Sequence, residues 1–136
     1  MNSNASSGNY VMIDLHIEQF GDIIIVHLDG VFNIDSISRV ERTWAEQVKK
    51  VPRLIAINCV KLESLDSSAI GSIVKFFNYA SSRGIMMVFY DLNPLLQKLF
   101  ETAKLTRYFN ITTMNEFKNR YFLQPVTQLR ETATAF

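Results

Sequence analysis

The side chains best suited to carry a regulated chemical change are those of Asp66, Ser67 and Ser68, which follow one another in the sequence. They lie between a short apolar run that ends near Val60 and a segment with the apolar spacing of a helix, which begins near Ile70. The serines are therefore expected at a helix start, where backbone N–H groups lack partners and the helix dipole is positive. In an open α/β sheet, functional sites gather in such loops after the carboxyl ends of strands.

Two interpretations of these serines follow from the same position. In the first, Asp66 or Ser67 is a helix N-cap that stabilises the fold by about 1 kcal/mol. In the second, Ser67 accepts a phosphate, whose charge of about −1.5 to −2 at pH 7 is stabilised by the free N–H groups and the dipole. That phosphate would leave the fold unchanged, and together with Asp66 it would repel a partner that carries negative charge.

Other residues that could support catalysis or ligand binding give weaker signals. The five glycines are scattered at turns and form neither a phosphate-binding loop nor a dinucleotide fingerprint. His16 and His27 have no paired metal-ligand spacing nearby and are expected on the surface of a hairpin. The single cysteine, Cys59, can form no internal disulfide and is expected as a buried thiol. We therefore expect no catalytic residues, no metal site and no cofactor.

The N-terminal part of the chain has the pattern of an antiparallel hairpin. Apolar and polar residues alternate over 13–17, which predicts a strand with one wet face. Gly21-Asp22 is a tight-turn signal, so 23–28 should return as the second strand, with Gly30 at its end.

The rest of the chain alternates between buried strands and amphipathic helices. Strands are expected at 54–60 and 85–90, with a short one at 109–112. Four helices are marked by apolar stripes, which consist of Ile37, Val40, Trp44 and Val48; Ile70, Ile73, Val74, Phe77 and Ala80; Leu95, Leu96, Leu99, Phe100 and Ala103; and Met114, Phe117 and Tyr121. This order predicts a single α/β domain with a mostly parallel sheet of four to five strands, an N-terminal antiparallel hairpin and about four helices.

Local signals also predict details at the helix ends and one surface feature. Asp35 or Ser36 is expected to cap the first helix, and Asn93-Pro94 to begin the third. Phe76 is adjacent to Phe77 on the second helix, so both cannot face the core fully. Phe76 is interpreted either as part of a docking surface or as a partly covered surface aromatic.

Composition indicates an ordinary globular protein. The 136 residues are 48% hydrophobic and 20% charged, with a formal net charge of +1. This balance gives no sign of a nucleic-acid-binding surface. No apolar run reaches the roughly 20 residues that span a bilayer, and residues 1–9 lack the features of a signal peptide. We expect a cytoplasmic protein without direct membrane insertion, with a disordered leader at 1–9, a domain at 10–123 and a C-terminal tail at 124–136.

From about Met12 to about Phe117 the chain resembles the STAS domain family, named for sulfate transporters and anti-sigma factor antagonists. The most specific match is 66–71, Asp-Ser-Ser-Ala-Ile-Gly, which resembles the family's Asp-Ser-Ser-Gly-Leu-Gly. Asp29-Gly30, Arg83-Gly84 and Asn93-Pro94 support the resemblance.

The resemblance implies a non-enzymatic anti-sigma factor antagonist that is switched by phosphorylation. The serine directly after the motif aspartate is Ser67, with Ser68 as the second choice. The unphosphorylated form is expected to bind an anti-sigma factor that is also a serine kinase, and to free a sigma factor. Phosphorylation then inactivates it, and a serine phosphatase resets it. The expected partner-binding residues are Asp29, Asn33, Asp66, Ser67, Ser68, Ala69 and Gly71.

Two positions depart from the family pattern. Ile70 replaces a leucine of the same volume, which is a mild change. Ala69 replaces a glycine, and alanine would be strained there if φ is positive but favourable if the residue lies in the first helical turn.

Two further roles remain open for the same fold. One is a scaffold subunit of a signalling assembly, in which the tail and helix faces are expected to mediate stable self-association. A homodimer is left open for either role. The other is a peripheral subunit of a membrane transport system.

Overall fold

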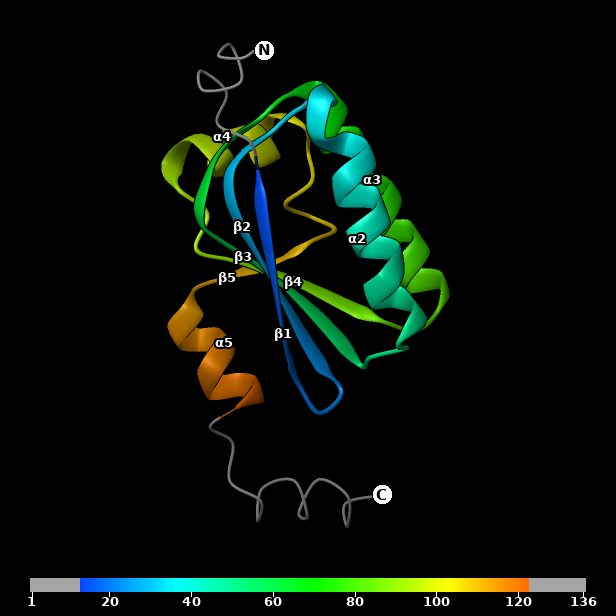
Figure 1. The fold of residues 1–136 in the computed structure, drawn as a ribbon. Coiled ribbons are helices and arrows are strands. Elements are labelled where there is room, and N and C mark those ends of the chain that lie inside the picture. Colours follow the sequence, from blue (N-terminus) through cyan, green and yellow to red (C-terminus); the bar gives the residue numbers. More distant parts are fainter. Residues whose placement is uncertain (1–12, 123–136) are drawn as a thin grey trace.

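The computed structural model describes residues 13–122 as a five-stranded sheet flanked by helices (Figure 1). The strands follow the order β1-β2-β3-β4-β5 across the sheet. β1 (Asp14–Phe20) pairs antiparallel with β2 (Ile23–Phe32), and the other neighbouring strands pair in parallel. The predicted α/β fold is therefore confirmed. The predicted leader and tail, and both ends of the predicted domain, lie outside the described residues.

Helices alternate with the remaining strands along the chain. In order, the elements are the 3-10 turn η1 (Ile34–Ser36), α2 (Ile37–Lys49), β3 (Leu54–Leu65), α3 (Ser67–Ser82), β4 (Met86–Tyr90), α4 (Pro94–Thr102), β5 (Asn110–Thr112) and α5 (Met114–Tyr121). The four predicted helices are therefore confirmed. Of the helices within residues 13–122, none combines the length and the apolarity that crossing a bilayer requires.

The sheet buries apolar side chains on both faces, which explains the nearly continuous apolar runs of its central strands. α2 and α3 lie together on one side of the sheet and α5 lies on the other (Figure 1). Ile24 and Ile55 belong to the core beneath α2 and α3, whereas Ile25 and Ala56 pack in the cluster that contains Phe117 of α5. Neighbouring strand residues thus face opposite layers, as the two-residue period of a strand requires.

The first helix has one of the two predicted N-cap residues but a different set of capping bonds. The side chain of Asn33 accepts the Asp35 N–H at 3.0 Å, and the Asn33 N–H donates to Ser36 Oγ at 3.1 Å. Ser36 precedes α2 but makes no side-chain capping bond to it. Ser36 therefore holds the N-cap position of α2, which is one of the two predicted residues, but the side-chain capping bonds are made by Asn33 at the 3-10 turn that precedes α2.

β2 does not end at Gly30, and β3 does not end at Val60. Gly30 has a φ of 113° and lies at a register shift, after which pairing continues to Phe32 and Leu65. This φ is open to glycine at no steric cost, so the chain forms an irregularity instead of a turn. The two strands therefore extend up to the start of η1 and of α3.

Phe76 is buried, so its interpretation as a docking residue or a partly covered surface aromatic was wrong. It is 6% exposed, and its ring stacks on Trp44 with centroids 4.7 Å apart. Its neighbour Phe77 is half-buried and packs against Phe109 at 4.9 Å. Both aromatics contact the core because α3 has packed neighbours on two sides.

Candidate functional site

Asp66, between β3 and α3, fixes the geometry of the predicted site. Its Oδ1 accepts the Ala69 N–H at 2.8 Å, which caps α3, and its Oδ2 accepts the Ile34 N–H at 2.9 Å. The Asp66 N–H donates to the Phe32 carbonyl at 3.3 Å. One residue therefore ties the start of α3 to the start of η1, which lies 32 residues earlier in the chain.

Ser67 is the first residue of α3, and it is exposed. The backbone N–H groups of Ser67 and Ser68 donate to no protein acceptor within residues 13–122. The next two amides are occupied, because Ala69 and Ile70 donate to the side chain and the carbonyl of Asp66. Two free amides and the helix dipole therefore favour an anion beside Ser67.

The residues that follow Ser67 are small, and the structure decides the question left open at Ala69. Ala69 is the third residue of α3 and does not have a positive φ. It is fully buried, and alanine is favoured over glycine inside a helix. Ser68 is half-buried and Gly71 is exposed, with nothing within 4 Å of a Cβ built at Gly71. The start of α3 thus carries little side-chain bulk beside Ser67.

The two predicted contact residues outside the motif lie in different places. Asp66 accepts the N–H of Ile34, and Asn33 directly precedes Ile34. Asn33 therefore lies near the start of α3. Asp29 pairs in register with Lys61, four residues before the end of β3, which is about 13 Å of extended strand. Asp29 lines a groove on the sheet instead. The structure therefore brings Asn33 to Ser67 but not Asp29.

Two exposed apolar side chains at this end of the sheet were not predicted from the sequence. Ile34 of η1 is 65% exposed, and Leu95 of α4 is 53% exposed. Leu95 and Leu96 were both expected on the apolar side of this helix, but Leu96 is buried and Leu95 is not. Asn93 caps α4 and donates to the Leu62 carbonyl at 3.2 Å, which attaches α4 to the end of β3. No periodic pattern marks Ile34, because its place depends on a contact between distant segments.

A groove of about 430 Å³ lies on the sheet, and most of the residues that line it, from β1, β2 and β3, have polar side chains. In it, His27 Nε2 is 2.5 Å from Glu18 Oε1, and His27 Nδ1 is 2.8 Å from Asn58 Nδ2. Asn58 Oδ1 accepts the Val60 N–H at 3.0 Å, so the Asn58 amide donates to Nδ1. This network assigns the imidazole proton to Nε2, which donates to Glu18. Both ring nitrogens of His27 are therefore hydrogen-bonded to its neighbours, and neither is free to act as a general base.

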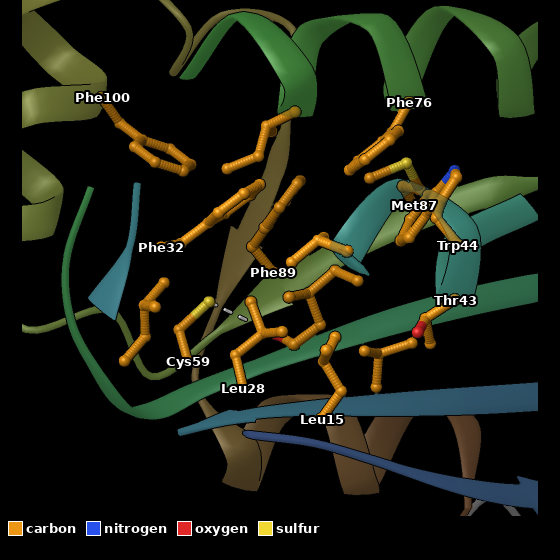
Figure 2. A pocket seen from close by; sticks show the side chains of 15 residues that line it. Leu15, Leu28, Phe32, Thr43, Trp44, Cys59, Phe76, Met87, Phe89 and Phe100 are labelled. Atoms are coloured by element: carbon orange, nitrogen blue, oxygen red, sulfur yellow. Dashed lines mark hydrogen bonds between the residues drawn. The ribbon is translucent and has the colours of Figure 1, made fainter. Parts of the chain in front are cut away.

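Neither a metal site nor a reactive thiol is present in the part of the chain that the structure describes. No three His, Cys, Asp or Glu side chains of residues 13–122 are placed to hold a metal ion. Cys59 is 1% exposed, and burial, with a smaller contribution from the Asp91 charge, raises the pKa of its thiol strongly. Its Sγ lies 3.7 Å from the Ile57 carbonyl (Figure 2). The predicted buried thiol is thus confirmed.

The core contains a small cavity between the sheet and the helices. Figure 2 shows its lining, which includes Leu15, Cys59, Phe89 and Phe100. Its volume is about 20 Å³, which is close to the space for a single water molecule. This cavity is too small for a cofactor, so the start of α3 remains the candidate site.

Comparison with known proteins relates this fold to one family. Residues 14–118 match the family model described as the STAS domain. No curated protein matches the chain in sequence.

Solved structures of low sequence identity share the fold. An anti-sigma factor antagonist from Mycobacterium paratuberculosis is 14% identical, with a TM-score of 0.71 over 77% of this chain and 90% of that one. A putative anti-sigma factor antagonist from Thermotoga maritima is 20% identical, with a TM-score of 0.73 over 78% and 92%. The anti-sigma factor antagonist SpoIIAA in its unphosphorylated form is 16% identical, with a TM-score of 0.68 over 79% and 95%.

Proposed function

The chain belongs to the STAS domain family, and from that premise we propose that it is an anti-sigma factor antagonist switched by phosphorylation of Ser67. In its unphosphorylated form it binds an anti-sigma factor that is also a serine kinase, and thereby frees a sigma factor. Phosphorylation of Ser67 inactivates it, and a serine phosphatase restores it. It acts in the cytoplasm by binding and catalyses no reaction.

The observation that carries this proposal is the arrangement at the start of α3. Ser67 is exposed, so a kinase can reach its hydroxyl without unfolding the helix. A phosphate on that oxygen would lie beside the free amides of Ser67 and Ser68 and at the positive end of the helix dipole. The modified form is therefore expected to keep the fold.

The same arrangement supports a switch in partner binding. A phosphate adds about −1.5 to −2 charges at pH 7. Two hydrogen bonds hold the Asp66 carboxylate in place next to Ser67, so this carboxylate cannot rotate away from the phosphate. A partner that docks against the bare hydroxyl with acidic groups or nucleotide phosphates would then meet like charge, which costs several kcal/mol in an interface.

Phosphosite mapping tests the proposed site. The chain is incubated with ATP and an extract of the source organism, and the product is analysed by intact-mass and peptide mass spectrometry. We expect one added phosphate, located on Ser67, which Ser67→Ala abolishes.

Ser68→Ala is the matched control, because it removes the neighbouring hydroxyl and leaves Ser67 in place. It should retain the phosphate. Undiminished uptake by Ser67→Ala, or loss of uptake only in Ser68→Ala, would contradict the assignment.

A further inference from the structure

β1 forms one edge of the sheet and has an open side. Within residues 13–122, its only neighbour is β2, with which it pairs over seven residues without a register shift. Natural edge strands are often protected by proline, by charged side chains and above all lysine, by bulges or by a very short length. The sequence of β1, Asp-Leu-His-Ile-Glu-Gln-Phe, contains neither proline nor lysine. Among residues 13–122, no strand pairs with this edge.

The hairpin turn determines which backbone groups of β1 point to the open edge. Phe20 and Ile23 flank a two-residue turn, and residues in this position exchange both backbone hydrogen bonds. The bonding alternates along the strand. Leu15, Ile17 and Gln19 therefore direct their backbone N–H and C=O groups away from β2.

A second copy of β1 fits this edge in one antiparallel register. With Ile17 on the two-fold axis, Ile17 faces Ile17 of the second copy, and Leu15 faces Gln19 of the second copy. All outward-pointing residues then lie in hydrogen-bonded pairs, each of which exchanges two bonds. Leu15 and Ile17 are half-buried against the core, so the added strand would also cover their remaining apolar surface.

The polar side chains of β1 favour the same register. With Ile17 on the axis, His16 lies opposite Glu18 of the second copy, and this contact occurs twice. Moving the axis one residue earlier would place Asp14 opposite Glu18, and one residue later would place Glu18 opposite itself. Like charges placed directly opposite each other destabilise a strand pair, whereas a histidine ring N–H can donate a hydrogen bond to a carboxylate opposite it.

We propose that two copies of this chain associate through β1, in antiparallel register about Ile17, so that their sheets join into one. The contact uses the backbone of β1 and leaves Ser67 outside the paired residues. The association therefore does not depend on the proposed phosphorylation, and either one can fail alone.

Disulfide cross-linking of the full chain tests the register. Ile17→Cys brings two cysteines into a hydrogen-bonded pair with Cα atoms about 5.5 Å apart, within reach of a disulfide. We expect a covalent dimer under mild oxidation. The native thiol of Cys59 is buried and should not compete.

Matched controls use the neighbouring outward residues. Gln19→Cys alone should give no covalent dimer, because Gln19 lies opposite Leu15 of the second copy. Mixing Gln19→Cys with Leu15→Cys should give a mixed dimer. Cross-linking of Gln19→Cys to itself, without cross-linking of Ile17→Cys, would overturn the register.

Sedimentation of the unmodified chain and two charge variants tests the association itself. The chain should sediment as a dimer that dissociates on dilution. His16→Glu places like charges opposite each other twice and should raise the dissociation constant roughly ten-fold or more, whereas His16→Lys should retain the dimer. Circular dichroism should show the same fold for both variants. A monomeric unmodified chain, or equal association of the two variants, would overturn the proposal.

Discussion

The starts of α3 and α4 lie at the same end of the sheet and are capped in the same way, but they differ in their first exposed residues. Asp66 Oδ1 accepts the Ala69 N–H at 2.8 Å, and Asn93 Oδ1 accepts the Leu96 N–H at 2.8 Å. In each helix the third residue is fully buried. The cap and the packing beneath it are therefore not what distinguishes a candidate switch.

The difference lies at the first helical position. α3 begins with Ser67, which offers a hydroxyl and a free N–H, whereas α4 begins with Pro94, which has neither. The remaining contacts of the two caps also have opposite polarity. Asp66 Oδ2 accepts a backbone N–H, and Asn93 Nδ2 donates to a backbone carbonyl. A helix start therefore becomes a candidate switch through its first exposed residue.

The largest expected effect is on partner binding. Ser67→Asp places a carboxylate at the first position of α3 and should weaken binding of the kinase partner roughly 100-fold, because like charges in an interface cost several kcal/mol. Pro94→Asp makes the same charge change at the first position of α4 and should change the affinity less than about ten-fold. Isothermal titration calorimetry measures both.

Ser67→Asn controls for side-chain size, because it is close to aspartate in shape but neutral. It should bind nearly as well as the unmodified chain. Equal losses for Ser67→Asp and Ser67→Asn would show that bulk and not charge weakens binding, and equal losses for Ser67→Asp and Pro94→Asp would remove the distinction between the two helix starts.

Exchanging the two capping side chains should destabilise both sites. Asn93→Asp keeps the cap of α4 but replaces the amide that donates to the Leu62 carbonyl with a carboxylate oxygen, which cannot donate. The free energy of unfolding should fall by about 2 kcal/mol. Asp66→Asn keeps the cap of α3 and loses the acceptor for the Ile34 N–H, at a cost of about 1 kcal/mol. Urea denaturation measures the free energy of unfolding of each variant. Unchanged midpoints would mean that the second contacts contribute nothing.

Restoring the family's glycine at position 69 should have a smaller effect. Ala69 is helical and fully buried, so Ala69→Gly should lower the free energy of unfolding by about 1 kcal/mol through increased backbone freedom and lost packing. Thermal unfolding measures the change. A stabilised variant would indicate that the Ala69 methyl group is strained.

The smallest expected effect is the response of the fold itself to charge at α3. Ser67→Asp should stabilise the chain by about 0.5 kcal/mol relative to Ser67→Asn, because a negative charge interacts favourably with the helix N-terminus. Added salt should reduce this difference. If Ser67→Asp were less stable than Ser67→Asn at low salt, the proposed stabilisation of a phosphate by the N-terminus of α3 would be contradicted.

The local features of the site were predictable from sequence because neighbouring residues determine them. Asp66 and Asn93 follow strands and precede apolar helical stripes, and both act as N-caps. The two-residue turn at Gly21-Asp22 is present as predicted. That Ser67 is phosphorylated stays a prediction.

Features that depend on distant contacts could not be predicted in this way. The bond from Ile34 to Asp66 joins residues 32 positions apart, so no local pattern marks it. Gly30 carries the usual signal of a strand end, but pairing with β3 continues past it. Phe76 was misread because the helical stripe of α3 does not show that Trp44 covers it from α2.

The double attachment of Asp66 has a consequence for the thermodynamics of recognition. Its carboxylate holds the backbone of η1 and the backbone of α3 in one arrangement before any partner arrives. Ordering a backbone residue costs about 1–2 kcal/mol in conformational entropy, and a partner that contacts both segments would not have to supply it. The entropy lost on association would then come mainly from side chains such as that of Ile34, which is exposed at the surface.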